Sequence, residues 1–247
     1  MCRVGCSPYG RSMFLETDSV GHGGRSRPSS VSTIAKVRSR RRVRRRPVFF
    51  DDRHEGDAGY AQGGYASGVV AAAFGTPIVE VRSLRPVPLG RQTELAPMPG
   101  GRFELRSGEG THAVGVRADL AIDLPTGPSA AAGVWTPHAG EVDARGRVLT
   151  EFVWAALDCP QLSALRQEGL INSNESVVSA IRTTRIDRPV VAGESYMVMG
   201  WLIAREGRMI VAGGAVIAPD GAPCVIGLHT AIAASRETAR LSRLSGP

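Results

Sequence analysis

Apolar positions along the chain follow two different periods, one typical of helices and one typical of strands. In residues 151–160 (EFVWAALDCP), apolar side chains recur at the three- and four-residue separations of a helix face. Residues 63–75 (GGYASGVVAAAFG) begin with two glycines and predict a second helix, made of small residues. Pro160 has no backbone N–H to donate, so we expect the helix over 151–160 to end or bend there.

Most of the other apolar positions predict strands. Alternation of apolar and polar residues is clearest in segments that follow each predicted helix. The predicted strands are 48–52, 76–87, 91–95, 101–107, 111–122, 176–190, 194–204, 208–218 and 223–233. Pro219-Asp220-Gly221 predicts a hairpin turn between the last two. The Pro-, Ala- and Gly-rich residues 123–146 predict a connection, and residues 162–170 a turn or a second helix.

The order of elements repeats, because each predicted helix is followed by several strands. RPVPLG at 85–90 and RPVVAG at 188–193 share the pattern R-P-V-x-x-G at the end of the first long strand after each helix. This match supports an internal duplication. We therefore predict an α+β fold with two halves, 48–122 and 134–233, and a linker over 123–133. A central helix wrapped by an antiparallel sheet, occurring twice and packed as a pseudo-dimer, is a double hotdog.

The positive charge of the chain belongs to its beginning. Of 30 Lys and Arg residues, 12 lie in residues 1–47 with only two acids, which leaves 18 basic and 21 acidic residues elsewhere. The folded body is thus mildly acidic, and its charge does not support a nucleic-acid-binding domain. Residues 1–47 are expected to be disordered and 234–247 a polar tail. The basic run 36–46 leaves three interpretations open: binding to nucleic acid or an acidic surface, a solvated tail, or residues that precede the true translation start.

Several functional classes lack support in the sequence. The four cysteines fit no zinc spacing, so we expect reduced thiols and a cytoplasmic protein. No apolar run approaches the roughly 18 residues of a membrane span, and we expect no membrane segment. There is no phosphate-binding loop, dinucleotide fingerprint, metal-ligand cluster or G-x-S-x-G elbow. We therefore expect neither a metal nor a cofactor.

A family resemblance rests on three segments of the second half and one of the first. They are VWAALDCP (153–160), IDRPVVAGESYMVMGWL (186–202), GRMIVAGGAVIAPDG (207–221) and GGYASGVVAAAF (63–74). With these segments, residues 48–233 resemble the hotdog-fold acyl-CoA thioesterase superfamily, particularly actinobacterial proteins of the phenylacetate-pathway type. The chain departs from that pattern beside the expected ligand channel, with SAAAG at 129–133 and Gln161-Leu162 after the second helix segment.

The resemblance implies a site on the central helices. It places the role of base or nucleophile on Asp158, with a backbone N–H at a helix start polarising the thioester carbonyl. A donor at a helix start lies about 10 Å from a group seven residues later, so one helix cannot present both groups to one carbonyl. Two antiparallel helices can. We therefore predict a composite site of Asp158 and Gly64, and an inactive mirrored site with Ala71 in place of the acid.

Other residues have weaker assignments. Gly63, Tyr65 and Trp154 are candidate substrate-binding residues, Tyr65 through its N–H or as a channel wall and Trp154 at the acyl pocket; core packing is the alternative for both side chains. His54 and Glu55 would contact a ligand or belong to a solvated loop. His138 and His229 have no partner that the sequence suggests.

Four functions remain open at this point. The leading one is hydrolysis of acyl-CoA or acyl-carrier thioesters, with the thioester as substrate and a homodimer as a possible assembly. The others are acyl-CoA binding without catalysis, hydratase chemistry, which lacks an expected Asp/His pair in a loop, and nucleic-acid binding by the basic tail.

Overall fold

The computed structural model describes residues 45–126, 131–167, 169–171 and 175–235, all within one compact unit. Its described α-helices are α1 (Gly63–Ala71) and α2 (Thr150–Gln167), and three short 3-10 helices span Asp52–His54, Pro99–Gly101 and Ala139–Glu141. Its described strands are β1 (Arg46–Phe49), β2 (Ile78–Ser83), β3 (Gln92–Met98), β4 (Arg102–Ser107), β5 (Gly110–Arg117), β6 (Ala131–Trp135), β7 (Glu175–Ile186), β8 (Tyr196–Glu206), β9 (Met209–Ile217) and β10 (Pro223–Ser235).

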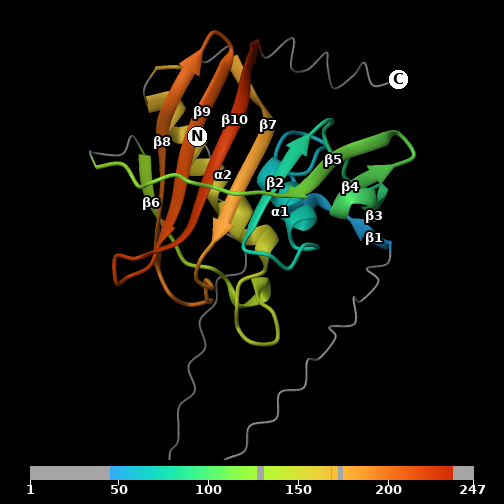
Figure 1. Cartoon of the computed structure of the whole chain (residues 1–247), viewed down its shortest axis with the longest axis horizontal. Helices are drawn as coiled ribbons and strands as arrows, with labels where there is room; N and C mark the ends of the chain where they lie inside the picture. Colours follow the sequence, from blue (N-terminus) through green and yellow to red (C-terminus); the bar gives the residue numbers. More distant parts are fainter. Residues whose placement is uncertain (1–44, 127–130, 168, 172–174, 236–247) are drawn as a thin grey trace, which may run out of the picture. The chain divides into compact units, whose positions relative to one another are not determined.

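The strands form one antiparallel sheet in the order β1-β3-β4-β5-β2-β7-β10-β9-β8-β6. Its two halves meet where β2 pairs with β7. Outwards from that joint, one half reads β2-β5-β4-β3-β1 and the other β7-β10-β9-β8-β6, so the strands correspond one to one. Along the chain, each half has one strand, its helix and then four strands (Figure 1). The predicted α+β architecture of two halves packed as a pseudo-dimer is confirmed.

The repeated R-P-V-x-x-G motif has the same role in both halves. The Gly90 N–H donates to the Phe50 carbonyl just after β1 (2.9 Å), and the Gly193 N–H donates to the Pro137 carbonyl just after β6 (3.2 Å). Both glycines have positive φ, +69° and +82°, a conformation that side chains with a Cβ adopt at a cost. The motif therefore ties an equivalent glycine turn to the end of the first strand in each half.

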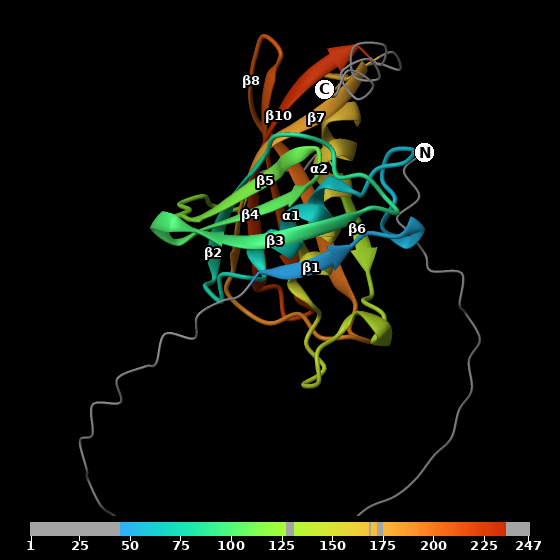
Figure 2. The same ribbon diagram turned by 90° about the vertical axis from the view of Figure 1, so that its right-hand side faces the viewer.

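Opposite faces of the sheet are covered by different parts of the chain. Both helices lie on one face, and the connection from β5 to β6 crosses the other (Figures 1 and 2). Ile122 and Leu124 of this connection pack against the buried Trp201 and Ile217, and Arg185 donates to the Leu120 carbonyl at 2.9 Å. The helices are thus enclosed between the curved halves of the sheet, where most of the buried apolar side chains gather.

Helix α2 does not end at Pro160, one of the two predicted outcomes, because it continues to Gln167. The sheet beneath it is lined by glycines, which lets the helix approach closely on both sides of the proline. A Cβ on Gly227 would lie 2.9 Å from the Leu157 side chain, and one on Gly214 would lie 2.9 Å from the Gln161 amide. Packing of residues before and after Pro160 therefore outweighs the hydrogen bond that the proline removes. Residues 162–167 belong to this same helix rather than to a turn or a second one.

Two predicted boundaries are also wrong. Strand β6 begins at Ala131, inside the predicted linker and connection, and pairs with β8 as the outermost strand of its half. Strand β1 begins at Arg46, two residues inside the predicted tail. The rest of that tail, residues 1–44, and residues 236–247 of the polar end lie outside the described residues.

The predicted turn at 219–221 is present, with the Gly221 N–H donating to the Ala218 carbonyl at 2.9 Å. Neither described helix is long and apolar enough to cross a membrane.

Candidate active site

Helices α1 and α2 lie against each other through glycine residues. A Cβ on Gly64 would lie 2.7 Å from the Trp154 carbonyl oxygen, and one on Gly68 would lie under 3.0 Å from the Glu151 Cα. Because later residues of α1 meet earlier residues of α2, the two helices are antiparallel. The start of α1 therefore lies beside the middle of α2, which carries Asp158.

Asp158 is buried, with 6% of its surface exposed, and accepts hydrogen bonds from three donors, two at the start of α1 and one on β7. Its Oδ2 accepts from Gln62 Nε2 at 2.6 Å and from the Gly64 N–H at 3.3 Å. Its Oδ1 accepts from Arg182 Nη2 on β7. The donors offset the free-energy cost of burying a carboxylate. The structure thus brings Asp158 and Gly64 together from the two halves, while their chemical roles stay a prediction.

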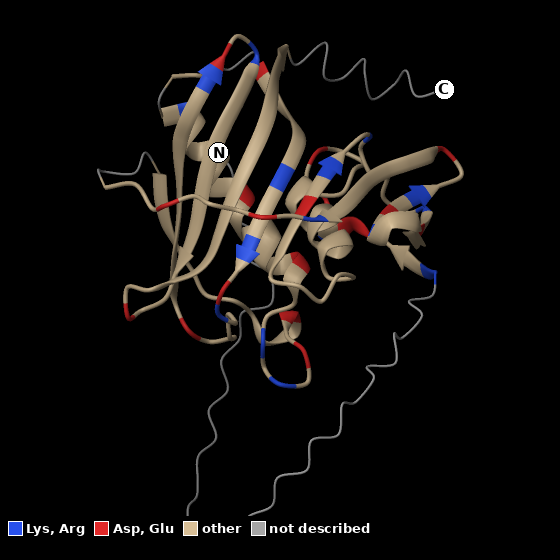
Figure 3. Ribbon diagram, viewed as in Figure 1, with Lys and Arg blue, Asp and Glu red and all other residues tan. Residues whose placement is uncertain are grey.

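Arg182 is a site residue that the sequence analysis missed. It is also 6% exposed. Its strand, β7, lies beside β10, and neither β10 nor β9 contains a Lys, Arg, Asp or Glu (Figure 3). Its Nη2 pairs with Asp158, whereas its Nη1 is buried and has no hydrogen-bond partner among the described residues. A Cβ on Gly63 would lie 3.2 Å from Nη1. The guanidinium is therefore placed against the first residue of α1.

Gln62 is the second residue that was missed, and it connects the helix start to the carboxylate. As the N-cap of α1, it accepts the Tyr65 N–H on Oε1 at 2.6 Å, which satisfies one of the free amides of the first turn. Its Nε2 donates to Asp158. One side-chain amide therefore fixes both the cap and the orientation of Asp158. Glutamine is not among the preferred N-cap residues, so the sequence offers little signal for this role.

His229 lies next to Arg182, because the two residues are directly paired between β10 and β7. Its Nε2 is 3.1 Å from Ser179 Oγ, and its Nδ1 has no partner in the described part of the chain. Burial holds the pKa of His229 well below the ordinary value of a histidine, and the charge of Arg182 lowers this pKa further. His229 is therefore neutral at physiological pH.

The ring of Tyr65 packs in an aromatic cluster rather than beside Asp158. It stacks on His54 at 4.4 Å between ring centroids and meets the edge of Phe152 at 5.2 Å. Burial, followed by the nearby carboxylates, raises the pKa of the Tyr65 hydroxyl to about 12. Its N–H is occupied by Gln62. The structure therefore favours the packing interpretation for Tyr65.

The remaining candidates of the sequence analysis lie in turns. His54 Nδ1 accepts the Asp51 N–H, Glu55 accepts the Gly59 N–H, and His138 Nδ1 accepts the Gly140 N–H, at 3.2, 2.8 and 3.1 Å. Each side chain thus contributes to the structure of its own loop.

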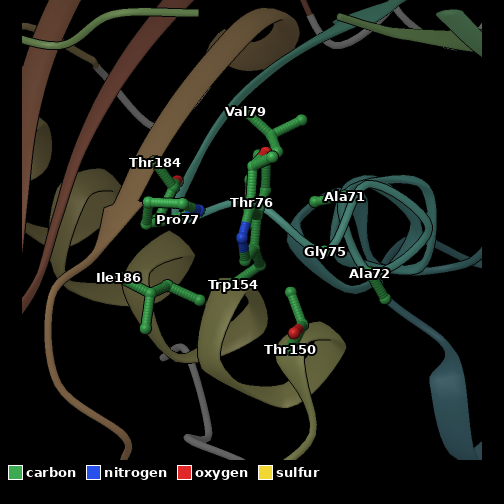
Figure 4. A pocket seen from close by; sticks show the side chains of 10 residues that line it. All are labelled: Ala71, Ala72, Gly75, Thr76, Pro77, Val79, Thr150, Trp154, Thr184 and Ile186. Carbon is green, nitrogen blue, oxygen red and sulfur yellow. The ribbon is translucent and has the colours of Figure 1, made fainter. Parts of the chain in front are cut away.

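Trp154 is 2% exposed and belongs to the core of the first half. It also lines a cavity of about 60 Å³ where the end of α1 meets the start of α2 (Figure 4). This is the position that corresponds, with the halves exchanged, to the site of Asp158. The cavity is lined by Ala71, Ala72, Thr150, Trp154, Thr184 and Ile186, among others. None of its lining residues is a carboxylate.

Comparisons with known proteins address the fold. The chain is similar to the 12:0-ACP thioesterase from Umbellularia californica, with a TM-score of 0.58 over 77% of this chain and 94% of that one, at 9% identity. It is equally similar to a tesB protein of Mycobacterium avium subs paratuberculosis, with a TM-score of 0.58 over 77% and 93% of the chains, at 12% identity. The chain has the double-hotdog fold. No protein-family model and no curated protein sequence matches it.

Proposed function

We propose that this double-hotdog protein hydrolyses acyl-CoA or acyl-carrier thioesters. Asp158 serves as base or nucleophile, and the Gly64 N–H serves as an oxyanion donor. The observation that carries the proposal is the contact of a buried carboxylate on the central helix of one half with the Gly64 N–H at the start of the other half's helix. The comparisons support it because both similar structures are described as a thioesterase or a tesB protein.

The hydrogen bonds around Asp158 leave one donor that a substrate can take over. Gln62 holds Oδ2 at 2.6 Å, and Arg182 holds Oδ1. The Gly64 N–H, at 3.3 Å, is beyond the usual range for an N–H···O bond and is the weaker contact of Oδ2. A thioester oxygen that enters beside Gly64 exchanges this long contact for its own. Asp158 keeps its orientation through the other two donors.

The proposed reaction moves one negative charge. As a base, Asp158 takes a proton from water, the water oxygen bonds to the thioester carbon, and the C–S bond then breaks. The leaving sulfur takes the proton, which yields a thiol and a carboxylic acid. As a nucleophile, Asp158 bonds to the same carbon and expels the thiolate, and water hydrolyses the resulting anhydride. In both cases the negative charge of Asp158 passes to the carbonyl oxygen, which the Gly64 N–H stabilises by donating a hydrogen bond.

The mirrored position does not repeat this arrangement. Ala71 stands where the counterpart of the carboxylate is expected, and the cavity there is lined by alanines, threonines and apolar side chains. We therefore propose one catalytic site per chain. No metal and no cofactor has a step in this scheme.

A second candidate is acyl-CoA binding without hydrolysis. The observation in its favour is that both oxygens of Asp158 are engaged by protein donors. If the Gly64 contact also persists when a thioester binds, the carboxylate meets neither water nor the carbonyl carbon, and the site only holds its ligand.

A substrate screen tests the proposal. The full-length protein is mixed with acyl-CoA thioesters from acetyl to palmitoyl, and with the same acyl groups on an acyl carrier protein, while a thiol reagent reports the released thiol. We expect saturable release above the spontaneous rate for at least one acyl group. Release at the spontaneous rate throughout, together with tight binding of an S-alkyl-CoA thioether, contradicts hydrolysis and favours the binding protein.

A further inference from the structure

The guanidinium of Arg182 has one nitrogen whose role is not explained by the fold. Nη2 pairs with Asp158, but Nη1 is buried without a partner among the described residues. An unsatisfied buried donor of a charged group destabilises the folded state. This nitrogen faces the start of α1, since a Cβ on Gly63 would lie only 3.2 Å from it.

We propose that Arg182 is a catalytic residue whose Nη1 donates a hydrogen bond to the thioester carbonyl oxygen, next to the Gly64 N–H. The inference rests on the proposed function, and it adds a second oxyanion donor to it. Two independent features converge on one place: the amides of the first turn of α1, which favour negative charge, and the unpartnered Nη1 from β7.

The movement of charge in the reaction explains why one arginine would contact both Asp158 and the carbonyl oxygen. The negative charge begins on Asp158, which Nη2 contacts, and develops on the carbonyl oxygen, which Nη1 would contact. The guanidinium therefore stays beside the charge in the ground state and in the transition state. Because the site is buried, donors that are already oriented need little rearrangement when the charge moves. The neutral imidazole of His229 adds no competing positive charge beside Arg182.

The proposal requires the planar fork of arginine and the small size of Gly63. A lysine has a single ammonium nitrogen and cannot hold the two oxygens in the same fixed geometry. A side chain at position 63 would press on Nη1, at a distance tighter than most real Cβ contacts. Gly63→Ala therefore displaces Nη1 by a few tenths of an ångström without removing any charge. It is the milder of two test variants.

Binding of two CoA analogues tests the contact without any turnover. In the ketone analogue a methylene group replaces the thioester sulfur, so the carbonyl oxygen remains. In the S-alkyl thioether a methylene group replaces the carbonyl, so that oxygen is missing. Both carry the acyl chain preferred in the substrate screen, or hexanoyl if none is hydrolysed. The ratio of their dissociation constants reports the contacts of the carbonyl oxygen. It is measured for four full-length proteins: wild type, Gly63→Ala, Arg182→Lys and Gly108→Ala. Gly108→Ala is the control, because its added Cβ meets no atom within 4 Å.

We expect wild type and Gly108→Ala to prefer the ketone equally, by about tenfold to a hundredfold, as a hydrogen bond to a charged group provides. Gly63→Ala and Arg182→Lys should reduce this preference by about tenfold. Where hydrolysis occurs, kcat of Arg182→Lys should fall by about 10²–10³. An unchanged preference in both variants overturns the role of Arg182, even if the protein is a thioesterase. A changed preference without hydrolysis contradicts only the proposed function, and failure of wild type to bind either analogue contradicts both.

Discussion

The buried ion pair of Arg182 and Asp158 gives a prediction about stability that does not depend on activity. The two side chains are 7% and 8% exposed. Arg182→Met keeps most of the side-chain volume but leaves a carboxylate in place without its positive partner. Breaking a buried pair in this way costs about 3–5 kcal/mol of unfolding free energy. Since Gln62 and Gly64 still donate to Asp158, we expect a value near 3 kcal/mol, on the order of the lower limit.

The matched control is Arg188→Met. Arg188 also pairs with an aspartate, Asp220, but these side chains are 46% and 57% exposed. Surface pairs contribute little to stability, so we expect no resolvable change. Urea unfolding followed by tryptophan fluorescence compares the two variants. For a folded body of this size, a loss near 3 kcal/mol in Arg182→Met corresponds to a drop in Tm of about 6–12 °C.

A double variant completes the test. Arg182→Met combined with Asp158→Leu removes both charges, and it should be more stable than Arg182→Met alone, since replacing both partners of a buried pair with apolar groups is often neutral. The reasoning is refuted if Arg182→Met is no less stable than Arg188→Met, or if the double variant loses the sum of the two single losses.

Two other predictions follow from packing and from titration. Gly68→Ala should push α1 away from Glu151 and lower kcat, and its overpacking cost of about 1–3 kcal/mol is partly offset by about 1 kcal/mol of helix propensity. Gly133→Ala has no atom near its added Cβ and should change neither the unfolding free energy nor kcat. Equal behaviour of the two variants contradicts the close helix contact. Because the folded state lowers the pKa of His229, the unfolded chain takes up its proton first as the pH falls below about 6.5, so stability should decrease by up to about 1.4 kcal/mol per pH unit. Urea unfolding between about pH 7.5 and 5.5 measures this slope, which should be smaller in His229→Leu; equal slopes would exclude the histidine.

Much of the fold could be predicted because its signals are local. The small-residue run at 63–75 and the alternating strands leave their period in the sequence, and the two R-P-V-x-x-G motifs mark equivalent turns. The meeting of Asp158 with Gly64 was also predictable. It follows from the length of a helix and from the need for two antiparallel helices, without any knowledge of side-chain contacts.

The parts that were missed depend on contacts between distant segments. Arg182 is followed in its strand by Thr183, Thr184 and Arg185, as in an exposed segment, and only the pairing of β7 with β2 and β10 places it in the interior. Gln62 lies 96 residues from Asp158 along the chain. Strand β6 was taken for a connection because its Ala and Gly residues leave little alternation, and it pairs only with β8.

Pro160 shows that tertiary packing can override a local rule. A proline predicts the end of a helix because it removes one hydrogen bond. In α2, the residues on both sides of Pro160 pack against glycine-lined strands, and a Cβ on Gly214 or Gly227 would press on them. The glycines of the sheet, which lie more than 50 residues away, therefore decide the length of the helix.

The most direct test of the account is the hydrolysis of the best thioester by wild type and by Asp158→Asn. Asparagine keeps the shape but cannot accept a proton as a base or act as a carboxylate nucleophile. Rates are divided by the folded fraction, because Asp158→Asn leaves Arg182 without its partner. Asp119→Asn, an exposed residue outside the site, is the control. We predict that Asp158→Asn loses about 10²–10⁴ of kcat while Asp119→Asn keeps the wild-type value. Equal turnover by wild type and Asp158→Asn would contradict the assignment of the site.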